Sequence, residues 1–174
     1  MFTTIIVLVI AVLAFLFYVN SRPSAFSMSR SITINAPAEK VFAQINSFKN
    51  WASWSPWEKM DPSMQRNYSG AASGTGAHYS WVGNKKVGEG AMEITRSVPS
   101  TNMQLDLHFL KPFKADNVTE FILMPEGKAT TIKWEMRGNL NLMMKTMHIF
   151  MDMDKVVGKD FENGLANLKA IVEK

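Results

Sequence analysis

The sequence of 174 residues contains no cysteine, so disulfide bonds, thiolate metal sites and cysteine nucleophiles are excluded. It also lacks a run of basic residues, because its 19 lysines and arginines are scattered and cannot follow a phosphate backbone. A His-Glu-x-x-His zinc motif, a Gly-x-Ser-x-Gly nucleophile motif and a phosphate-binding glycine loop are absent as well. We therefore expect no metal, no cofactor and no nucleic-acid partner.

The titratable side chains that could serve catalysis are few and isolated. Those expected on strands are His78, His108, Glu89, Glu93, Glu120 and Glu135. Alternation puts both histidines on the face opposite the neighbouring apolar residues, so they are expected to point outward. His148 is expected to be solvated or to cap a helix. Ring-closing catalysis in an apolar pocket would need a buried acid or base, and this remains an alternative to simple binding.

The N-terminal segment is the longest apolar stretch in the chain. Residues 5–19 (IIVLVIAVLAFLFYV) carry only aliphatic and aromatic side chains. Together with residues 2–4 they give about 18 residues, close to the length that spans a bilayer as a helix. Tyr18 stands where an interfacial aromatic is expected, and Asn20 to Pro23 end the helix. The sequence predicts a transmembrane anchor over residues 1–20, in contact with the membrane through residues 2–19, and a linker over residues 21–28.

A cleaved signal peptide is the alternative interpretation of this segment. It requires a lysine or arginine before the apolar run, and residues 1–4 contain neither. The residues directly after the run make a poor cleavage site, and the small residues around Ala25 lie rather far downstream. The sequence therefore favours a retained, single-pass anchor. Arg22 and Arg30 follow the run, which favours a cytoplasmic position for the rest of the chain.

Residues 29–174 have the pattern of one α+β domain. A strand at Ser29 to Ile34 is followed by one or two short helices between residues 37 and 57. Six further strands are predicted over residues 65–69, 76–82, 87–97, 103–110, 117–124 and 130–136. Short turns between them predict a curved antiparallel sheet of about seven strands. A helical period over residues 140–174 predicts one long C-terminal helix, with a bend near Gly158 and Gly164, which covers the apolar face of the sheet.

Four segments carry a resemblance to a known family. They are residues 30–42 (RSITINAPAEKVF), 50–57 (NWASWSPW), 76–84 (GAHYSWVGN) and 87–90 (VGEG). The sequence resembles the START/Bet v 1-like (SRPBCC) superfamily, and more closely its polyketide cyclase/dehydrase-like bacterial branch. This resemblance implies a helix-grip fold, in which the sheet wraps around the long helix and encloses a hydrophobic cavity. It does not imply one activity, because lipid carriers, hormone receptors and ring-closing enzymes share the fold.

The residues expected to line such a cavity are the apolar ones on one face of the sheet and of the final helix. On the sheet side they are Trp81, Leu105, Leu107, Phe109, Phe121, Leu123, Ile132, Trp134 and Met136. On the helix side they are Met143, Met147, Phe150, Met151 and Val157. The methionines suit a pocket that repacks around varied apolar ligands. The alternative is that all these side chains pack together and leave no cavity.

Three tryptophans, Trp51, Trp54 and Trp57, recur at intervals of three residues and share one face of a short helix. We expect them to pack as structural aromatics, rather than to form a lid or a membrane-interface contact. The leading hypothesis is a membrane-tethered module that binds a lipid or another hydrophobic small molecule. A cyclase or dehydratase using a buried carboxylate or histidine, and a ligand-free structural or regulatory module, are the alternatives.

Overall fold

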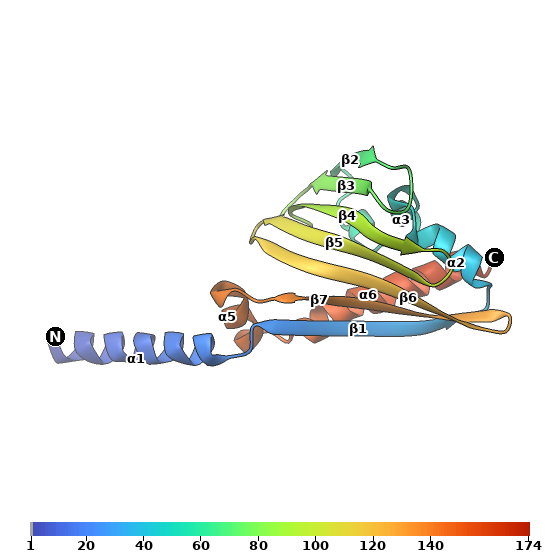
Figure 1. Ribbon diagram of the computed structural model, residues 1–174. Helices are drawn as coiled ribbons and strands as arrows, with labels where there is room; N and C mark the ends of the chain where they lie inside the picture. Colours follow the sequence, from blue (N-terminus) through green and yellow to red (C-terminus); the bar gives the residue numbers. More distant parts are fainter. Residues whose placement is uncertain (1) are drawn as a thin grey trace.

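The computed structural model describes residues 2–174 and has the α+β architecture that the sequence predicts. Seven strands form one antiparallel sheet in the order β1-β7-β6-β5-β4-β3-β2. The strands are β1 (Ala25–Ile34), β2 (Gln65–Gly70), β3 (Ala77–Val82), β4 (Glu89–Val98), β5 (Asn102–Lys111), β6 (Ala115–Glu126) and β7 (Ala129–Asn139). The helices are α1 (Phe2–Ser21), α2 (Ala38–Ile45), α3 (Phe48–Trp54), α4 (Trp57–Met60), α5 (Leu142–Phe150) and α6 (Met153–Val172). The curved sheet and the long helix α6 form the helix-grip arrangement (Figure 1).

Alternation of side chains determines which face of the sheet is buried. In β7, Thr130, Ile132, Trp134 and Met136 are buried, whereas the residues between them are partly exposed. The buried set belongs to the face that packs against α3 and α6, which we call the inner face. The same period-two pattern recurs in β3 and β6, so the hydrophobic alternation of the sequence carries directly into the sheet.

Strand β1 begins earlier than the sequence predicts. Ala25 already pairs with Asn139, and Phe26 pairs with Gly138. The predicted linker over residues 21–28 is therefore too long at its C-terminal end, because only residues 22–24 separate α1 from the sheet. Phe26 and Met28 place apolar side chains on the inner face at this end of β1.

The C-terminal region contains two helices, not the single bent helix that the sequence predicts. α5 ends at Phe150, and α6 begins at Met153. The side chain of Asp152 accepts a hydrogen bond from the backbone N–H of Lys155 and caps α6. The break lies at this N-cap, whereas Gly158 and Gly164 lie inside α6.

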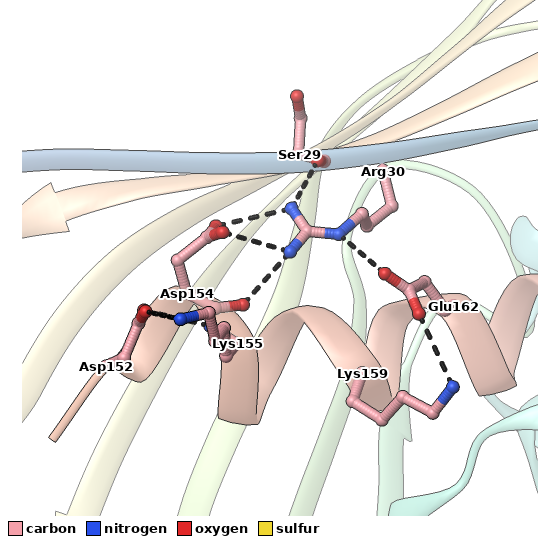
Figure 2. Close-up of polar contacts among 7 residues, drawn as sticks. All are labelled: Ser29, Arg30, Asp152, Asp154, Lys155, Lys159 and Glu162. Atoms are coloured by element: carbon pink, nitrogen blue, oxygen red, sulfur yellow. Dashed lines mark hydrogen bonds and ion pairs between the residues drawn. The ribbon is translucent and has the colours of Figure 1, made fainter.

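An arginine on the inner face of β1 attaches α6 to the sheet (Figure 2). Arg30 donates from Nε to Oε1 of Glu162 at 3.0 Å and from Nη2 to Oδ2 of Asp154 at 3.0 Å. It also donates to the main-chain oxygens of Ser29 and Asp154. The guanidinium lies over Gly158, where a Cβ would collide with it. A glycine at this position lets the strand and the helix approach closely enough for the ion pairs to form.

Helix α1 projects away from the domain at the end where β1 begins and α5 lies (Figure 1). Among residues 2–174 it is the one helix long and apolar enough to cross a membrane, a property that a signal sequence shares. Its side chains are exposed except near the domain, where Val19 is buried. Arg30 is paired with acidic residues within the domain, so of the two arginines used to predict orientation only Arg22 remains beside the helix end. The cytoplasmic orientation stays a prediction.

Candidate ligand cavity

A cavity of about 260 Å³ lies between the inner face of the sheet and helices α3 to α6. Its wall is almost entirely apolar and includes side chains from β1 and from every strand between β3 and β7. A cavity of about 150 Å³ is large enough to hold benzene, so this one has room for roughly ten non-hydrogen atoms. A cavity of this size bounded by apolar side chains is suited to binding a small hydrophobic molecule.

Six of the predicted sheet residues line this cavity. They are Trp81, Leu105, Leu107, Phe109, Trp134 and Met136. Trp81 is fixed by a hydrogen bond from its indole N–H to the carbonyl oxygen of Val87 at 3.0 Å. The alternation of β5 places Leu105, Leu107 and Phe109 side by side on the inner face, so one strand supplies half of this set.

The other three predicted sheet residues lie in the packed core instead. Phe121, Leu123 and Ile132 are on the inner face but are fully buried and do not line the cavity. Trp51 and Trp54 of α3 pack edge-to-face against Phe121, with ring centroids 5.9 and 6.1 Å apart. These two indoles occupy the space that a ligand would otherwise fill at this end of the inner face. Trp54 is fully buried and is a structural aromatic as expected, whereas Trp51 packs in the core and also borders the cavity.

The helix side of the cavity differs from the predicted set. Met144 and His148 of α5 and Met153, Val157 and Phe161 of α6 line it, so of the predicted helix residues only Val157 does. Met143, Phe150 and Met151 are exposed, and Met147 lines a shallow neighbouring groove with Phe113. On α5 the lining residues follow the predicted ones by one position, since Met144 and His148 line the cavity in place of Met143 and Met147. The break at Asp152 gives α5 and α6 separate orientations, so one helical period cannot describe both.

Two aromatic residues near the opening also differ from expectation. His148, expected to be solvated or to cap a helix, lines the cavity and packs against Phe26 with ring centroids 6.2 Å apart. Trp57, expected to be purely structural, is only partly buried and forms part of the cavity wall. Both residues are therefore in a position to contact a bound molecule.

The one carboxylate in the cavity wall is Glu58 of α4, which the sequence did not single out. Its Oε1 accepts a hydrogen bond from the Tyr79 hydroxyl at 2.6 Å, and its Oε2 accepts one from Nε of Arg66 at 2.6 Å. Burial, reinforced by the hydrogen bond to Glu58, raises the pKa of Tyr79 far above its ordinary value, so the phenol stays protonated. The sequence search considered carboxylates on strands, and a glutamate on a four-residue helix after Pro56 has no pattern that marks it.

The titratable residues that the sequence singled out on the strands lie outside the cavity. His78 contacts Ser69, and Nδ1 of His108 is hydrogen-bonded to Oδ1 of Asp116 at 2.6 Å. The carboxylates Glu89, Glu120 and Glu135 pair with Lys111, Arg137 and Lys133, and Glu93 is exposed. Both histidines face outward as predicted. Within residues 2–174 no group of three or more histidines and carboxylates is arranged to hold a metal ion.

Two polar residues of β6, Asn117 and Thr119, also face the cavity. They share the inner face with Phe121 and Leu123, so the period-two pattern contained the signal that would have found them. Phe121 and Leu123 were expected in the cavity wall, and Asn117 and Thr119 were not, because only apolar residues of β6 fit a hydrophobic wall.

Comparison with protein families agrees with this architecture. The family model described as "Polyketide cyclase / dehydrase and lipid transport" matches residues 25–173. The chain belongs to this family. It is therefore a member of the START/Bet v 1-like (SRPBCC) superfamily, as the sequence resemblance indicated. No curated protein matches the sequence.

Solved structures with the same fold are distant in sequence. Protein CV1439 from Chromobacterium violaceum superposes with a TM-score of 0.61 at 15% identity, covering 85% of this chain and 97% of that one. Ara h 8.0201 gives a TM-score of 0.59 at 13% identity, again covering 85% and 97%. The di-domain ARO/CYC BexL from the BE-7585A biosynthetic pathway gives 0.63 at 14% identity, covering 90% of this chain and 52% of that one. At these identities the likeness establishes the fold alone.

Helix α1 is not needed for this fold in the first two of these structures. Nearly all of each chain is matched by 85% of the present one, so the fold forms in chains that have almost no additional residues. In the present chain, α1 contributes only Val19 to the buried hydrophobic residues. All seven strands and helices α2 to α6 lie within residues 22–174, and the family model matches residues 25–173.

Proposed function

We propose that this family member is a membrane-tethered module that binds a lipid or another hydrophobic small molecule. The observation that carries the proposal is the apolar cavity of about 260 Å³ between the sheet and the helices. The family description, which includes lipid transport, supports the same class of ligand. The ligand-binding role falls on the residues that line the cavity, with Trp81, Leu105, Leu107, Phe109, Trp134 and Met136 on the sheet side.

Helix α5 connects the proposed anchor to the cavity. Its residues Met144 and His148 line the cavity. The same helix packs on α1, where the rings of Phe15 and Phe150 have centroids 6.3 Å apart and Lys145 Nζ donates to the carbonyl oxygen of Asn20 at 3.1 Å. If α1 spans the bilayer, α5 and its side of the cavity lie beside the membrane surface. An apolar molecule dissolved in the bilayer then has a short path to the cavity.

The surface around α5 is suited to contact with lipid. Six large apolar side chains are exposed on α5, at its C-terminal end, at the end of β5 and on the β5–β6 connection: Leu110, Phe113, Leu142, Met143, Phe150 and Met151. Helix α5 and the β5–β6 connection are adjacent, since Phe113 and Met147 line one groove and Asn141 donates to the carbonyl oxygen of Lys114. Both lie at the end of the domain from which α1 projects (Figure 1). This exposed set, and not the three tryptophans, is therefore our proposed contact with lipid.

The binding role is tested with residues 22–174 and naphthalene, a hydrocarbon of ten carbons. Equilibrium dialysis should show saturable binding at one site per chain. Leu107→Trp places a large side chain in the cavity and should weaken binding by about tenfold or more. Leu110→Trp adds the same side chain at an exposed position of the same strand and should leave the affinity unchanged. Absence of saturable binding in the unmodified domain would refute the proposal.

The tether is tested separately on the full chain. Intact mass measured in the membrane fraction of expressing cells should correspond to residues 1–174, because a retained anchor keeps the N-terminal segment. A shortened, soluble product would identify residues 1–24 as a cleaved signal and would leave the binding role untouched.

Catalysis of the cyclase or dehydratase type is a second candidate, and the buried Glu58 favours it. Tyr79 and Arg66 each donate a hydrogen bond to one of its oxygens, so both carboxyl oxygens already have a partner within the protein. This arrangement supports ligand positioning more than acid catalysis. Catalysis would be established by a substrate whose turnover is lost in Glu58→Gln while its binding is retained.

A further inference from the structure

The wall of the apolar cavity contains polar groups that the protein itself does not satisfy. Asn117 is 5% exposed and Thr119 is 3% exposed, and both line the cavity. Among residues 2–174, Oδ1 of Asn117 has no hydrogen-bond partner. Buried polar side chains in native proteins nearly always have one, because leaving such a group unpaired costs free energy. Asn117 therefore keeps an unused hydrogen-bonding capacity beside the cavity.

The surroundings of Asn117 show that its amide is held in a defined place. Asn117 lies between Leu107 of β5 and Gly138 of β7 in the sheet. A Cβ at Gly138 would collide with the Asn117 amide, so a glycine there leaves room for it. Thr119 lies two residues further along β6, between Leu105 and Met136. The two polar side chains therefore share one face of one strand and have apolar neighbours on both sides.

The charges around the cavity restrict the ligand further. The wall contains no lysine and no arginine, and its one acidic side chain, Glu58, is paired with Arg66. His148 is the one histidine in the wall, so a carboxylate or phosphate buried beside Asn117 would have no lysine or arginine to balance its charge and would share the cavity with Glu58. Such a burial is strongly unfavourable. A pure hydrocarbon would leave Asn117 and Thr119 unpaired.

We propose that the ligand is a neutral amphipathic molecule whose hydroxyl or carbonyl group is bound by Asn117 and Thr119. This inference rests on the proposed binding function and narrows it, because it excludes fatty-acid anions as the preferred ligand. Asn117 offers both an acceptor and a donor, and Thr119 offers a hydroxyl, so either kind of neutral group can be paired.

Three probes with one ring skeleton test the inference by equilibrium dialysis with residues 22–174 at neutral pH. They are naphthalene, 2-naphthol, which is neutral, and 2-naphthoate, which is an anion. We expect 2-naphthol to bind at least as tightly as naphthalene, although water solvates 2-naphthol better. We expect it to bind at least about 100-fold more tightly than 2-naphthoate. Thr119→Val, which removes the hydroxyl and keeps the shape, should weaken 2-naphthol by about tenfold and leave naphthalene unchanged. Asn117→Leu should have the same selective effect.

Thr131→Val is the matched control. Thr131 lies on the outer face of β7 and contacts Thr33, so its hydroxyl is outside the cavity and all three affinities should be unchanged. The inference is overturned if 2-naphthoate binds as well as 2-naphthol, or if Thr119→Val and Asn117→Leu leave the 2-naphthol affinity unchanged. An unchanged 2-naphthol affinity in both variants would mean that water, and not the ligand, pairs with Asn117 and Thr119. If naphthalene binds and 2-naphthol shows no such selectivity, only this inference fails. If no probe binds, the binding function itself fails.

Discussion

The inner face of the sheet is divided into a filled half and a hollow half, although the same strands build both. In the filled half, Phe121, Leu123 and Ile132 pack beneath α2 and α3. In the hollow half, Leu107 and Phe109 of β5 and Met136 of β7 border the cavity. The strands alternate in the same way along their whole length, so the division arises from the helices that cover them.

The filled half is held by interlocking aromatic rings. Trp54 and Phe121 are fully buried. At the border with the hollow half, Trp134 and Phe161 line the cavity and stack on each other with ring centroids 4.3 Å apart. Trp51 closes the cluster with a hydrogen bond from its indole N–H to the carbonyl oxygen of Ile45 at 2.9 Å. Such packing leaves little free volume, and each ring adds burial and edge-to-face contacts to the stability of the domain.

The hollow half is held by polar contacts around its edge. Arg30 joins β1 to α6, and Arg66 joins β2 to Glu58 of α4. Asp61 accepts hydrogen bonds from Ser63 and from the backbone N–H of Asn84, which ties the β3–β4 connection to the segment before β2. Since side chains do not fill the centre of this half, its walls depend on these contacts. The filled half is thus stabilised mainly by side-chain packing, whereas the hollow half, which keeps space for a ligand, is stabilised mainly by polar contacts.

The largest expected effect comes from truncating one leucine in each half of the inner face. Leu123→Ala in the filled half should lower the free energy of unfolding by about 3–4 kcal/mol, because it creates a new cavity. Leu107→Ala should cost only about 1–2 kcal/mol, since the side chain already borders empty space. Urea unfolding of residues 22–174, followed by circular dichroism, measures both. Equal losses would show that the two halves are packed alike.

The sequence predicts which residues lie on the inner face of the sheet. It does not predict where the filled half ends and the hollow half begins. Alternation placed Leu105, Phe121 and Trp134 on the inner face correctly, because period two in a strand is a local property. Whether Phe121 meets a ligand or an indole depends on how α3 docks, which is a tertiary property. The sequence could predict the face of the sheet but not what covers each part of it.

The final helices and the polar residues show two other limits of the sequence analysis. Phe150 and Met151 were assigned to the cavity by carrying one helical period through Asp152, which instead caps a new helix. An aspartate before an apolar stripe was a recognisable N-cap signal. Glu58 had no such signal, because its burial depends on contacts with Tyr79 and Arg66 from other elements.

A smaller effect is expected where Arg30 attaches α6 to β1 (Figure 2). Gly158→Ala should be neutral or destabilising, because the gain in helix propensity of about 1 kcal/mol is offset when the new methyl group displaces the guanidinium. In the Arg30→Met background the ion pairs are already absent, so the same substitution should cause a smaller loss or become stabilising. The double-mutant cycle should show a coupling of about 1 kcal/mol in urea unfolding. Additive effects would mean that Arg30 does not depend on the space above Gly158.

The smallest effect concerns pH and the Asp61 contact at the edge of the hollow half. Hydrogen bonds from the Ser63 hydroxyl and the Asn84 backbone N–H lower the pKa of Asp61 below its ordinary value. A carboxyl group whose pKa is lower in the folded state stabilises the fold above its unfolded-state pKa. This stabilisation is lost as the pH falls through the lowered pKa of the folded state, which places the loss below about pH 4.

Amide exchange of Asn84, measured by NMR, should therefore accelerate over that range after correction for the intrinsic pH dependence. Asp61→Asn should show faster exchange at neutral pH and no further acceleration in acid, because an amide group does not titrate there. Asp152→Asn removes another carboxylate with a lowered pKa, one that caps α6, and should leave Asn84 exchange unchanged. Acid acceleration that persists in Asp61→Asn would assign the pH response to another group and remove Asp61 from the contacts that hold the hollow half open.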